Sequence, residues 1–510
     1  MIGRRVNIAL KGAPSSSGPP HQSEKLRIDC MSRTLLFFVR AAYALFSSMS
    51  TEKFKRRTRK TGVPDWPFIT RCEYLLHLPL VCVFTLALAS CSAKQRSTPL
   101  SATPSVSPDN SSPTAADPTG NIIRELEERV RRDPEDFIAF NKLAGYYLQR
   151  LRETGDVKYL ELARRAADAS AAILPAEQNA GALSTLAQVN FASHNFGAAR
   201  EKALLLMGIE PRKSQPYQIL TDVLLELGDY KGAEGALQKL QQLSGGTIGS
   251  ETRLARFDLL RGQSQLAQQR LTNALALALD EVPAQKESIA WCRWQLGEAS
   301  FSTGKYEQAE HHYRDALQTF PNYYRALGSM ARTRAALSDF PGAIDYAERA
   351  VRILPDPTFV ALLGDLYKID GRQREADAQY SLVEHIAHLN ALNGSLYNRQ
   401  LALFYADHDM KPQEAFTLAS DEYKVRRDIY GADAVAWTAF KAGKIREATA
   451  AIQEALRLGT SDAKLFYHAG LIARASGDKS AASDYLKRAL ALNPGFDPLQ
   501  GRIARQALTE

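Results

Sequence analysis

The chain has 510 residues, of which 64 are Lys or Arg and 56 are Asp or Glu, giving a formal net charge of +8 at pH 7. Residues 1–90 hold 14 Lys or Arg and 5 Asp or Glu, a balance of +9, which leaves −1 for residues 91–510. Because the basic excess lies in the first ninety residues, the remainder lacks the cationic surface that nucleic-acid binding requires, and we expect no nucleic-acid partner.

Residues 1–48 form an N-terminal extension that matches neither the signal nor the repeats that follow it. A secretory signal rarely begins ninety residues before its end, and Met49 would be a more plausible first residue. We therefore expect translation to start downstream of Met1. The alternative is a membrane-associating helix beginning at Met31, although Arg33 and Arg40 interrupt its apolar run.

Residues 49–90 have the composition of a signal peptide. A basic stretch at 53–60 precedes an apolar run from Tyr74 to Ser90, which His77 and Pro79 interrupt. That run is short for a membrane span. Its end, Leu-Ala-Ser-Cys, resembles a bacterial lipobox, and the resemblance implies that Cys91 is lipidated and becomes the first mature residue. An ordinary cleaved signal, an uncleaved anchor and a chance apolar stretch are the alternatives.

Residues 91–119 are rich in Ser, Thr and Pro and nearly free of large apolar side chains. Such a segment cannot bury enough surface to fold, so we expect a disordered tether. A tether between a lipidated Cys91 and a folded domain indicates a lipoprotein anchored in the cell envelope. Ser92 is not the Asp that commonly retains such proteins at the inner membrane, so the outer membrane is the expected location in a cell that has one.

Residues 120–510 repeat a local pattern with a period of 34 residues, most clearly between Leu296 and Pro355. The recurring positions are Leu296-Gly297, Gly304, Ala309, Tyr313, Ala316 and Pro321, then Met330-Ala331, Ser338, Ala343, Ala347, Ala350 and Pro355. Apolar residues recur at the helical spacing of three and four, and glycines stand where a helix must stop and the chain reverse. This period predicts an all-α solenoid of stacked helical hairpins.

The pattern resembles the tetratricopeptide repeat, whose two antiparallel helices pack through a large-to-small seam. The better copies lie at 290–323, at 463–496 and around Leu363–Tyr380, with weaker copies between them. The resemblance implies a right-handed solenoid of about ten hairpins. One hairpin cannot bury its apolar face, so the array is stable only as a stack.

The resemblance also implies a concave groove lined by the first helix of each hairpin. The side chains expected on that face are Trp291, Trp294, Glu298, Phe301, Arg325, Arg332, Tyr430, Trp437, Phe440, Tyr467 and Arg474. Exposed Trp, Tyr and Arg dominate interface hot spots. The alternative is that these side chains pack between neighbouring first helices.

Enzyme signatures are absent: the sequence has no HExxH, GxxxxGK[ST], GxSxG or CxxC motif. Glu384 and His388 share one helix face and could form half of a metal site, but a solvated surface is the simpler interpretation. Cys292 is expected to be a small buried side chain rather than a nucleophile. We expect no catalytic residue, no metal and no cofactor.

These observations predict a non-catalytic scaffold or assembly adaptor that is tethered to a bacterial envelope membrane and binds protein segments in its groove. Aromatic grooves also suit glycans, so polysaccharide binding or export is an alternative. A metal-binding or enzymatic role near His385 and His388 is a further one. No Lys/Asn clamp of the kind that captures chaperone C-termini spans three consecutive repeats.

Overall fold

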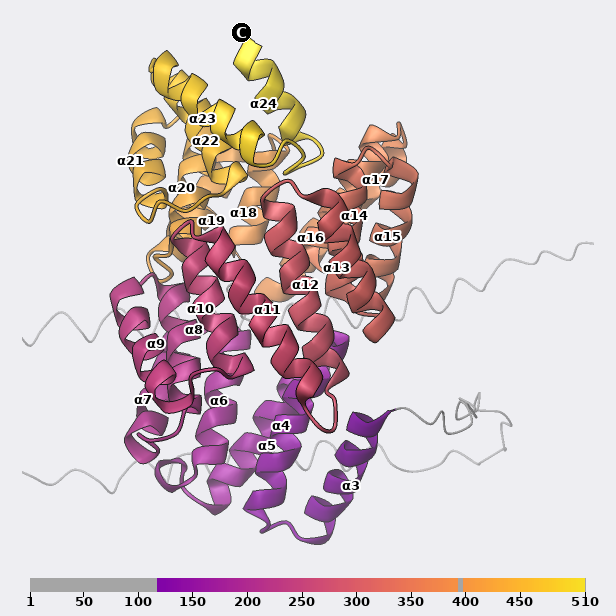
Figure 1. Ribbon diagram of the computed structural model, residues 1–510, viewed down its shortest axis with the longest axis vertical. Helices are drawn as coiled ribbons and strands as arrows, with labels where there is room; N and C mark the ends of the chain where they lie inside the picture. The colour runs from indigo at the N-terminus through magenta and orange to yellow at the C-terminus, as the bar shows by residue number, and fades with distance from the viewer. Residues whose placement is uncertain (1–116, 393–397, 510) are drawn as a thin grey trace, which may run out of the picture. The chain divides into compact units, whose positions relative to one another are not determined.

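The computed structural model describes residues 117–392 and 398–509 (Figure 1). Ser111–Glu510 forms one compact unit. The described residues contain 22 α-helices, α3 to α24, and no strand, which confirms the predicted all-α solenoid. The N-terminal extension, the signal peptide, Cys91 and the tether up to residue 116 lie outside the described residues.

Ten antiparallel hairpins make up the array, in agreement with the predicted number. In chain order they are α4 (Phe137–Thr154) with α5 (Lys158–Ile173), α6 (Ala180–Ala192) with α7 (Phe196–Ile209), α8 (Gln215–Leu227) with α9 (Tyr230–Ser244), α10 (Ile248–Leu260) with α11 (Ser264–Asp280), α12 (Lys286–Ser302) with α13 (Tyr306–Thr319), α14 (Tyr324–Ala336) with α15 (Phe340–Ile353), α16 (Pro357–Ile369) with α17 (Gln373–Leu392), α18 (Asn398–Asp407) with α19 (Pro412–Tyr423), α20 (Ile429–Lys441) with α21 (Ile445–Ala455), and α22 (Ala463–Ala475) with α23 (Lys479–Leu492).

Three further helical segments complete the described fold. Helix α3 (Pro118–Arg132) precedes the first hairpin and α24 (Gln500–Thr509) follows the last one. A short 3₁₀ helix, η2 (Ala176–Gln178), leads into α6.

The hairpin at 286–319 shows why the repeated residues form this unit. Gly304, between α12 and α13, has φ of 72°, a left-handed conformation that ends the first helix. A Cβ on Gly297 would overlap the ring of Tyr313, so the glycine allows the two helices to pack closely. Ala309 is fully buried where the helices meet. The large-to-small seam of the sequence pattern is therefore the contact between the helices of one hairpin.

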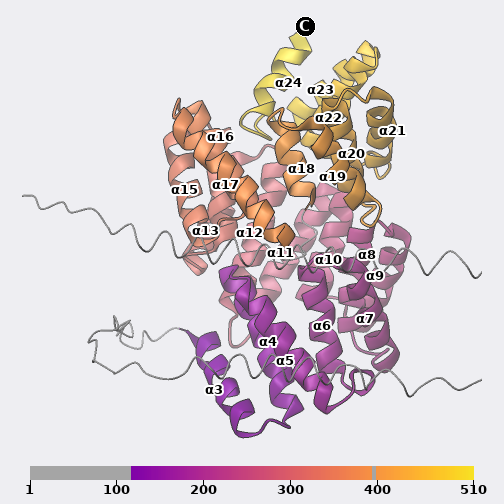
Figure 2. The same cartoon turned by 180° about the vertical axis from the view of Figure 1, so that it is seen from behind.

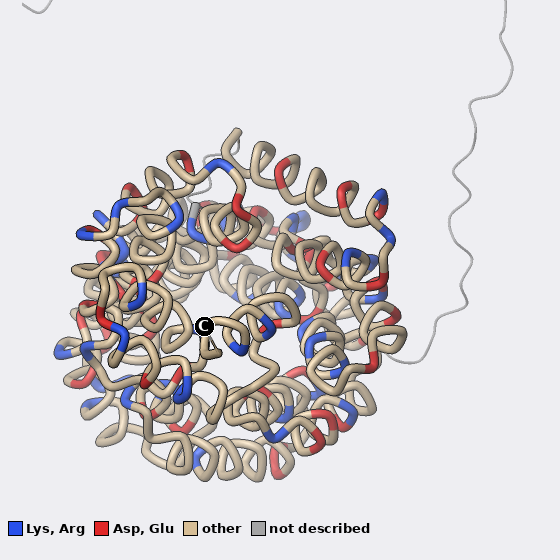
Figure 3. Tube along the Cα trace, turned by 90° about the horizontal axis from the view of Figure 1, so that it is seen from above, with Lys and Arg blue, Asp and Glu red and all other residues tan. Residues whose placement is uncertain are grey.

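The chain winds into a superhelix whose second turn packs on its first. One apolar core cluster includes buried residues of α6 to α10 together with buried residues of α20 to α22, far apart in the sequence. Figures 1 and 2 both show α20 and α22 beyond α8 and α10 along the long axis. Figure 3, the view from above, shows the helices disposed in a ring. The array is thus closed by contacts between hairpins that are not neighbours in sequence.

These contacts follow a regular scheme, which we call the inter-turn seam: the turns after α8, α10 and α12 meet the loops before α20, α22 and α24. The backbone N–H of Ile429 donates to the Tyr230 hydroxyl at 2.8 Å. The Thr460 hydroxyl donates to the carbonyl of Leu260, 200 residues earlier. At the last step, the Asn493 side-chain amide donates to the carbonyl of Phe301 at 2.8 Å. Each of these three turns therefore contacts the loop that follows the fifth hairpin after it.

Candidate binding groove

The first helices of hairpins one to five enclose a cavity of about 580 Å³, which we call the inner groove. Every lining residue belongs to α4, α6, α8, α10 or α12. They are Arg152, Gln188, Phe191, Gln215, Gln218, Ile219, Asp222, Ile248, Gly249, Thr252, Arg253, Glu287, Ser288 and Trp291. The groove therefore lies on the helices that the sequence pattern assigns to the concave face.

The two ends of this helical arc meet at one contact. The Arg152 guanidinium at the end of α4 donates to Glu287 at the start of α12, with Nε and Oε2 separated by 3.4 Å. Glu287 is 8% exposed, and this burial raises the pKa of its carboxyl despite the attraction of Arg152. The first helices of hairpins one to five therefore form an arc whose two end helices, α4 and α12, contact each other beside the inner groove.

The charged side chains of the groove are paired with one another. Arg253 donates to Asp222 through Nη2 at 2.6 Å and through Nε at 3.1 Å. Arg152 is engaged by Glu287 as described. Two cations and two carboxylates therefore cancel, and the cavity presents no net charge to a ligand.

Some of the uncharged polar groups that line the inner groove have no hydrogen-bond partner among the described residues. Gln215 donates to the Ser184 hydroxyl at 2.5 Å. Within the described residues, by contrast, neither the side-chain amide of Gln218 nor the indole N–H of Trp291 has a hydrogen-bond partner. Apolar walls from Phe191 and Ile219 flank them. Free amide and indole groups between apolar walls can hold a peptide backbone together with its apolar side chains.

Of the residues predicted on the concave face, Trp291 lines the inner groove. Four others form a network between α12 and α14. The Trp294 indole donates to the Ser329 hydroxyl at 2.9 Å, and the Arg325 guanidinium lies 5.4 Å from the Trp294 ring centre. Glu298 accepts a bond from Arg332 at 2.7 Å. Burial opposes ionisation of Glu298, but Arg332 and two hydroxyl donors outweigh it and lower the carboxyl pKa.

Three predicted residues, Phe301, Trp437 and Tyr467, are buried, with exposed fractions of 4%, 0% and 1%. The Trp437 indole donates to Asp407 at 2.8 Å, and its ring stacks on His468 at a centroid distance of 4.1 Å. These three side chains cannot reach a ligand in this structure. They belong to the packing between neighbouring first helices, which was the alternative interpretation of the sequence.

The remaining predicted residues have individual surroundings. Phe440 is half-buried and stacks on Trp437 at 5.2 Å. Arg474 donates to the carbonyl of Ala507 in α24 at 3.0 Å. Tyr430 is 40% exposed and lies at the inter-turn seam. The concave positions of the second superhelical turn thus contribute mainly to packing and to the seam.

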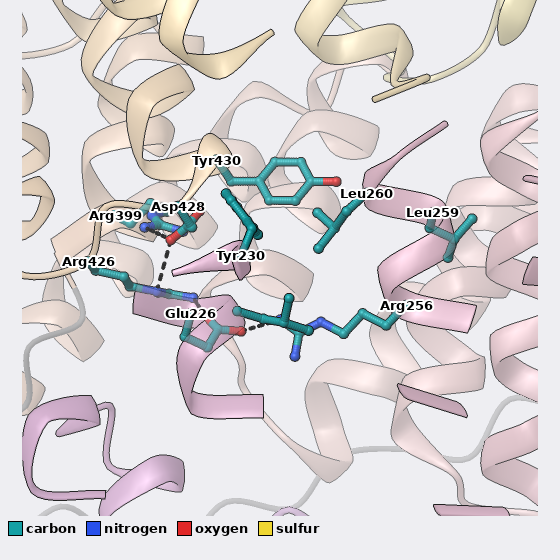
Figure 4. A pocket seen from close by; sticks show the side chains of 10 residues that line it. Glu226, Tyr230, Arg256, Leu259, Leu260, Arg399, Arg426, Asp428 and Tyr430 are labelled. Atoms are coloured by element: carbon teal, nitrogen blue, oxygen red, sulfur yellow. Dashed lines mark hydrogen bonds and ion pairs between the residues drawn. The ribbon is translucent and has the colours of Figure 1, made fainter. Parts of the chain in front are cut away.

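A smaller cavity of about 170 Å³ lies at the seam itself (Figure 4). Glu226 of α8 bridges Arg256 of α10 and Arg426 of the α19–α20 loop. Asp428 binds Arg399 at 2.7 Å and Arg426 at 3.4 Å. Burial alone would raise the pKa of Glu226, but the two arginines lower it to about 2. This network joins residues 200 positions apart, for which the sequence pattern contains no signal.

The sequence raised Glu384, His385 and His388 as possible metal ligands and Cys292 as a possible nucleophile. Glu384 accepts a bond from Lys411 at 2.5 Å, and His385 and His388 are exposed. In residues 117–392 and 398–509, no group of three or more His, Cys, Asp or Glu side chains is placed to hold a metal ion. Cys292 is fully buried, and this burial raises the pKa of its thiol to about 12. The thiol is therefore protonated at neutral pH and is a poor nucleophile.

None of the helices in the described part of the chain has both the length and the apolar composition needed to cross a membrane.

Comparison with known proteins identifies the repeat. The family model for the tetratricopeptide repeat matches residues 295–356 and 435–495, which overlap the two best copies of the sequence pattern. No curated protein matches the sequence.

Several solved structures are similar. The APC/C hetero-tetramer Cut9–Hcn1 aligns at 14% identity over 77% of this chain and 73% of that one, with a TM-score of 0.40. The human IFIT1 dimer with PPP-AAAA aligns at 14% identity over 74% and 95%, with a TM-score of 0.40. PilF of Pseudomonas aeruginosa aligns at 16% identity over 41% and 93%, with a TM-score of 0.34. At these TM-scores the similarities carry no argument about function.

Family match and hairpin geometry agree. Arrays of this repeat are protein-interaction scaffolds, and the inner groove gives this chain a surface suited to that role. The chain is a tetratricopeptide-repeat protein.

Proposed function

We propose that this protein is a non-catalytic scaffold that holds an extended, uncharged peptide segment of a partner protein in the inner groove, while a lipid on Cys91 tethers it to a bacterial envelope membrane. The observation that carries the peptide half of the proposal is the composition of the groove. Its four charges are internally paired, whereas the Gln218 amide and the Trp291 indole are available.

An extended backbone fits these groups better than a charged ligand does. A peptide unit offers one donor and one acceptor per residue, and a side-chain amide can satisfy both. A strongly charged segment would have to separate Arg253 from Asp222 or Arg152 from Glu287 before it could gain an ion pair. Apolar side chains on the same segment would pack against Phe191 and Trp291, the two aromatic residues that line the cavity.

The tether is supported by the sequence alone. A basic stretch, an apolar run, Leu-Ala-Ser-Cys91 and a Ser/Thr/Pro-rich segment follow one another in the order that a lipoprotein requires. Labelling cells with a radioactive fatty acid tests this part of the proposal, because the Cys91→Ala variant should lose the label. Equal labelling of the variant would contradict it.

The peptide half is tested by selecting displayed random peptides on Ser111–Glu510 and measuring their affinity by fluorescence anisotropy. Gln218→Ala and Trp291→Ala should each weaken binding, whereas Gln238→Ala, an equivalent change on the exposed face of α9, should not. If selected peptides bind all variants equally, they bind outside the inner groove and the proposal is wrong.

A polysaccharide is the alternative ligand. Aromatic stacking faces are what glycan binding requires, and the buried positions of Trp437 and Tyr467 remove two of those expected from the sequence. Binding of a soluble envelope polysaccharide, lost in Trp291→Ala but unaffected by the selected peptides, would favour this alternative.

A further inference from the structure

Exposed apolar side chains gather on the outer face of α7. Leu204, Leu205 and Ile209 are 42%, 40% and 37% exposed, and Gly208 lies exposed between them. Positions 204, 205, 208 and 209 share one side of a helix because residues four apart lie on the same face. The opposite side, Ala199, Ala203 and Leu206, is fully buried in the core, so α7 is apolar on both sides.

The surroundings place this face on the outside of the array. Helices α7 and α9 are second helices of their hairpins, and Figures 1 and 2 both show them outside α6 and α8. Ile173, at the end of the preceding second helix α5, is also 37% exposed. The groove and this outer face are therefore on opposite helices of the same hairpins. We call Leu204, Leu205, Gly208 and Ile209 the α7 patch.

Exposed cations lie on α7, on the segment that follows it and on α9. Arg200 precedes the α7 patch on the same helix, Arg212 and Lys213 follow the patch, and Lys231 and Lys239 lie on the exposed face of α9. None of these five side chains makes an ion pair with another described residue. Of the carboxylates on these helices and their loops, Glu201 lies 3.8 Å from Lys202, and Glu234 pairs with Arg261 at 3.1 Å. Asp168 pairs with Arg164 at 2.7 Å, which leaves Glu177, Glu210 and Asp229 without an ion pair among the described residues.

An apolar stripe accompanied by unpaired cations has the chemistry of a surface that rests on an anionic bilayer. We propose that the α7 patch docks on an anionic lipid surface, with Leu204, Leu205 and Ile209 entering the interface and Arg200, Arg212 and Lys213 contacting lipid phosphates. A second copy of the chain is a weaker candidate, because two such patches facing each other would bring ten unpaired cations together.

This docking goes beyond the tether and is independent of it. A lipid on a long flexible segment holds a protein near a membrane without fixing its orientation. Contact through the outer face of α7 would orient the array with the inner groove turned away from the bilayer. The peptide-binding surface would then remain open to a partner while the protein lies on the membrane.

The test uses Ser111–Glu510, which is a compact unit and lacks Cys91. Flotation with vesicles of phosphatidylethanolamine and phosphatidylglycerol should recover this fragment, and vesicles of phosphatidylcholine alone should not. The triple variant L204S/L205S/I209S should lose binding about tenfold or more, because it removes the apolar contact area. The control L266S/L279S removes side chains that are 38% and 50% exposed on α11, and it should bind like the wild type.

A charge variant keeps the test independent of folding. R200Q/R212Q/K213Q alters no apolar side chain and should weaken binding about fivefold for each charge removed, with a smaller dependence on salt. Failure of the wild-type fragment to float, or equal flotation of the triple and control variants, would overturn the proposal. So would a light-scattering mass that changes from dimer to monomer in the triple variant, since the α7 patch would then join two copies. Selected peptides should bind all these variants alike, which separates this result from the test of the groove.

Discussion

The first and second turns of the superhelix are built from the same repeat but treat their concave faces differently. In the first turn, α4 to α12 enclose the inner groove, where Gln218 and Trp291 have unused hydrogen-bonding groups. In the second turn, the residues predicted on the concave face of α20 and α22 include Trp437 and Tyr467, which are buried. The comparison shows that the repeat determines where the concave face lies, whereas the side chains on it determine whether that face binds a ligand or stabilises the fold.

The largest expected loss of stability follows from a substitution at Trp437, on the concave face of the second turn. Trp437→Ala removes a fully buried ring that stacks on His468 and leaves the Asp407 carboxylate without one of its donors. We expect a loss of about 3–5 kcal/mol in the free energy of unfolding, measured by urea denaturation. Trp437→Phe, which keeps an aromatic ring, should lose less. Wild-type stability of the alanine variant would mean that Trp437 belongs to an adaptable surface, like the residues of the first turn.

The second effect concerns the seam that joins the two turns. Glu226→Gln leaves Arg256 and Arg426 without their shared carboxylate, which should cost about 3 kcal/mol and increase the radius of gyration measured by X-ray scattering as the turns separate. Glu234→Gln removes an exposed partner of Arg261 and serves as the control, with an expected cost below about 1 kcal/mol. Equal losses of unfolding free energy in the two variants would show that the Glu226 network stabilises the fold no more than an exposed ion pair does.

The seam should also respond to pH. The pKa of Glu226 is about 2 in the folded protein and is lowered from an ordinary value of 4.5. A lowered folded pKa means that the stabilisation by Glu226 is fully present above about pH 4.5 and is lost as the pH falls toward 2. Scattering and denaturation measured through this window should show the wild type weakening and the Glu226→Gln variant changing less. A variant that follows the wild-type profile would assign the acid sensitivity to other carboxylates.

The smallest effect on stability is expected in the inner groove. Trp291→Ala removes a partly exposed side chain whose indole N–H has no described partner, so we expect a cost of about 1 kcal/mol in unfolding. Its effect on affinity for selected peptides should be larger, about tenfold, as for an aromatic hot spot. The loss of stability and the loss of peptide affinity are compared by urea denaturation and fluorescence anisotropy on the same preparation. A loss of stability as large as that of Trp437→Ala would erase the contrast between the turns.

The repeat period made the fold predictable because the residues that pack one hairpin lie close together in the sequence. Gly297, Gly304 and Tyr313, for example, all belong to one copy of the repeat. The concave face followed from the same period, and Trp291 does line the inner groove. The sequence left open whether Trp437 is exposed or packed, because its burial depends on His468 in the next hairpin and on Asp407 in the previous one. The Glu226–Arg426 contact spans 200 residues and has no periodic signature at all.

The inter-turn seam has a consequence for how the length of this array can change. In an open solenoid each repeat interacts only with its neighbours, so a repeat can be gained or lost at a cost confined to one junction. Here Tyr230 meets Ile429, Leu260 meets Thr460 and Phe301 meets Asn493 in step. Deleting one hairpin between these partners would shift every pair out of phase at once. The winding therefore sets the number of repeats between the two turns, and this array is no longer modular.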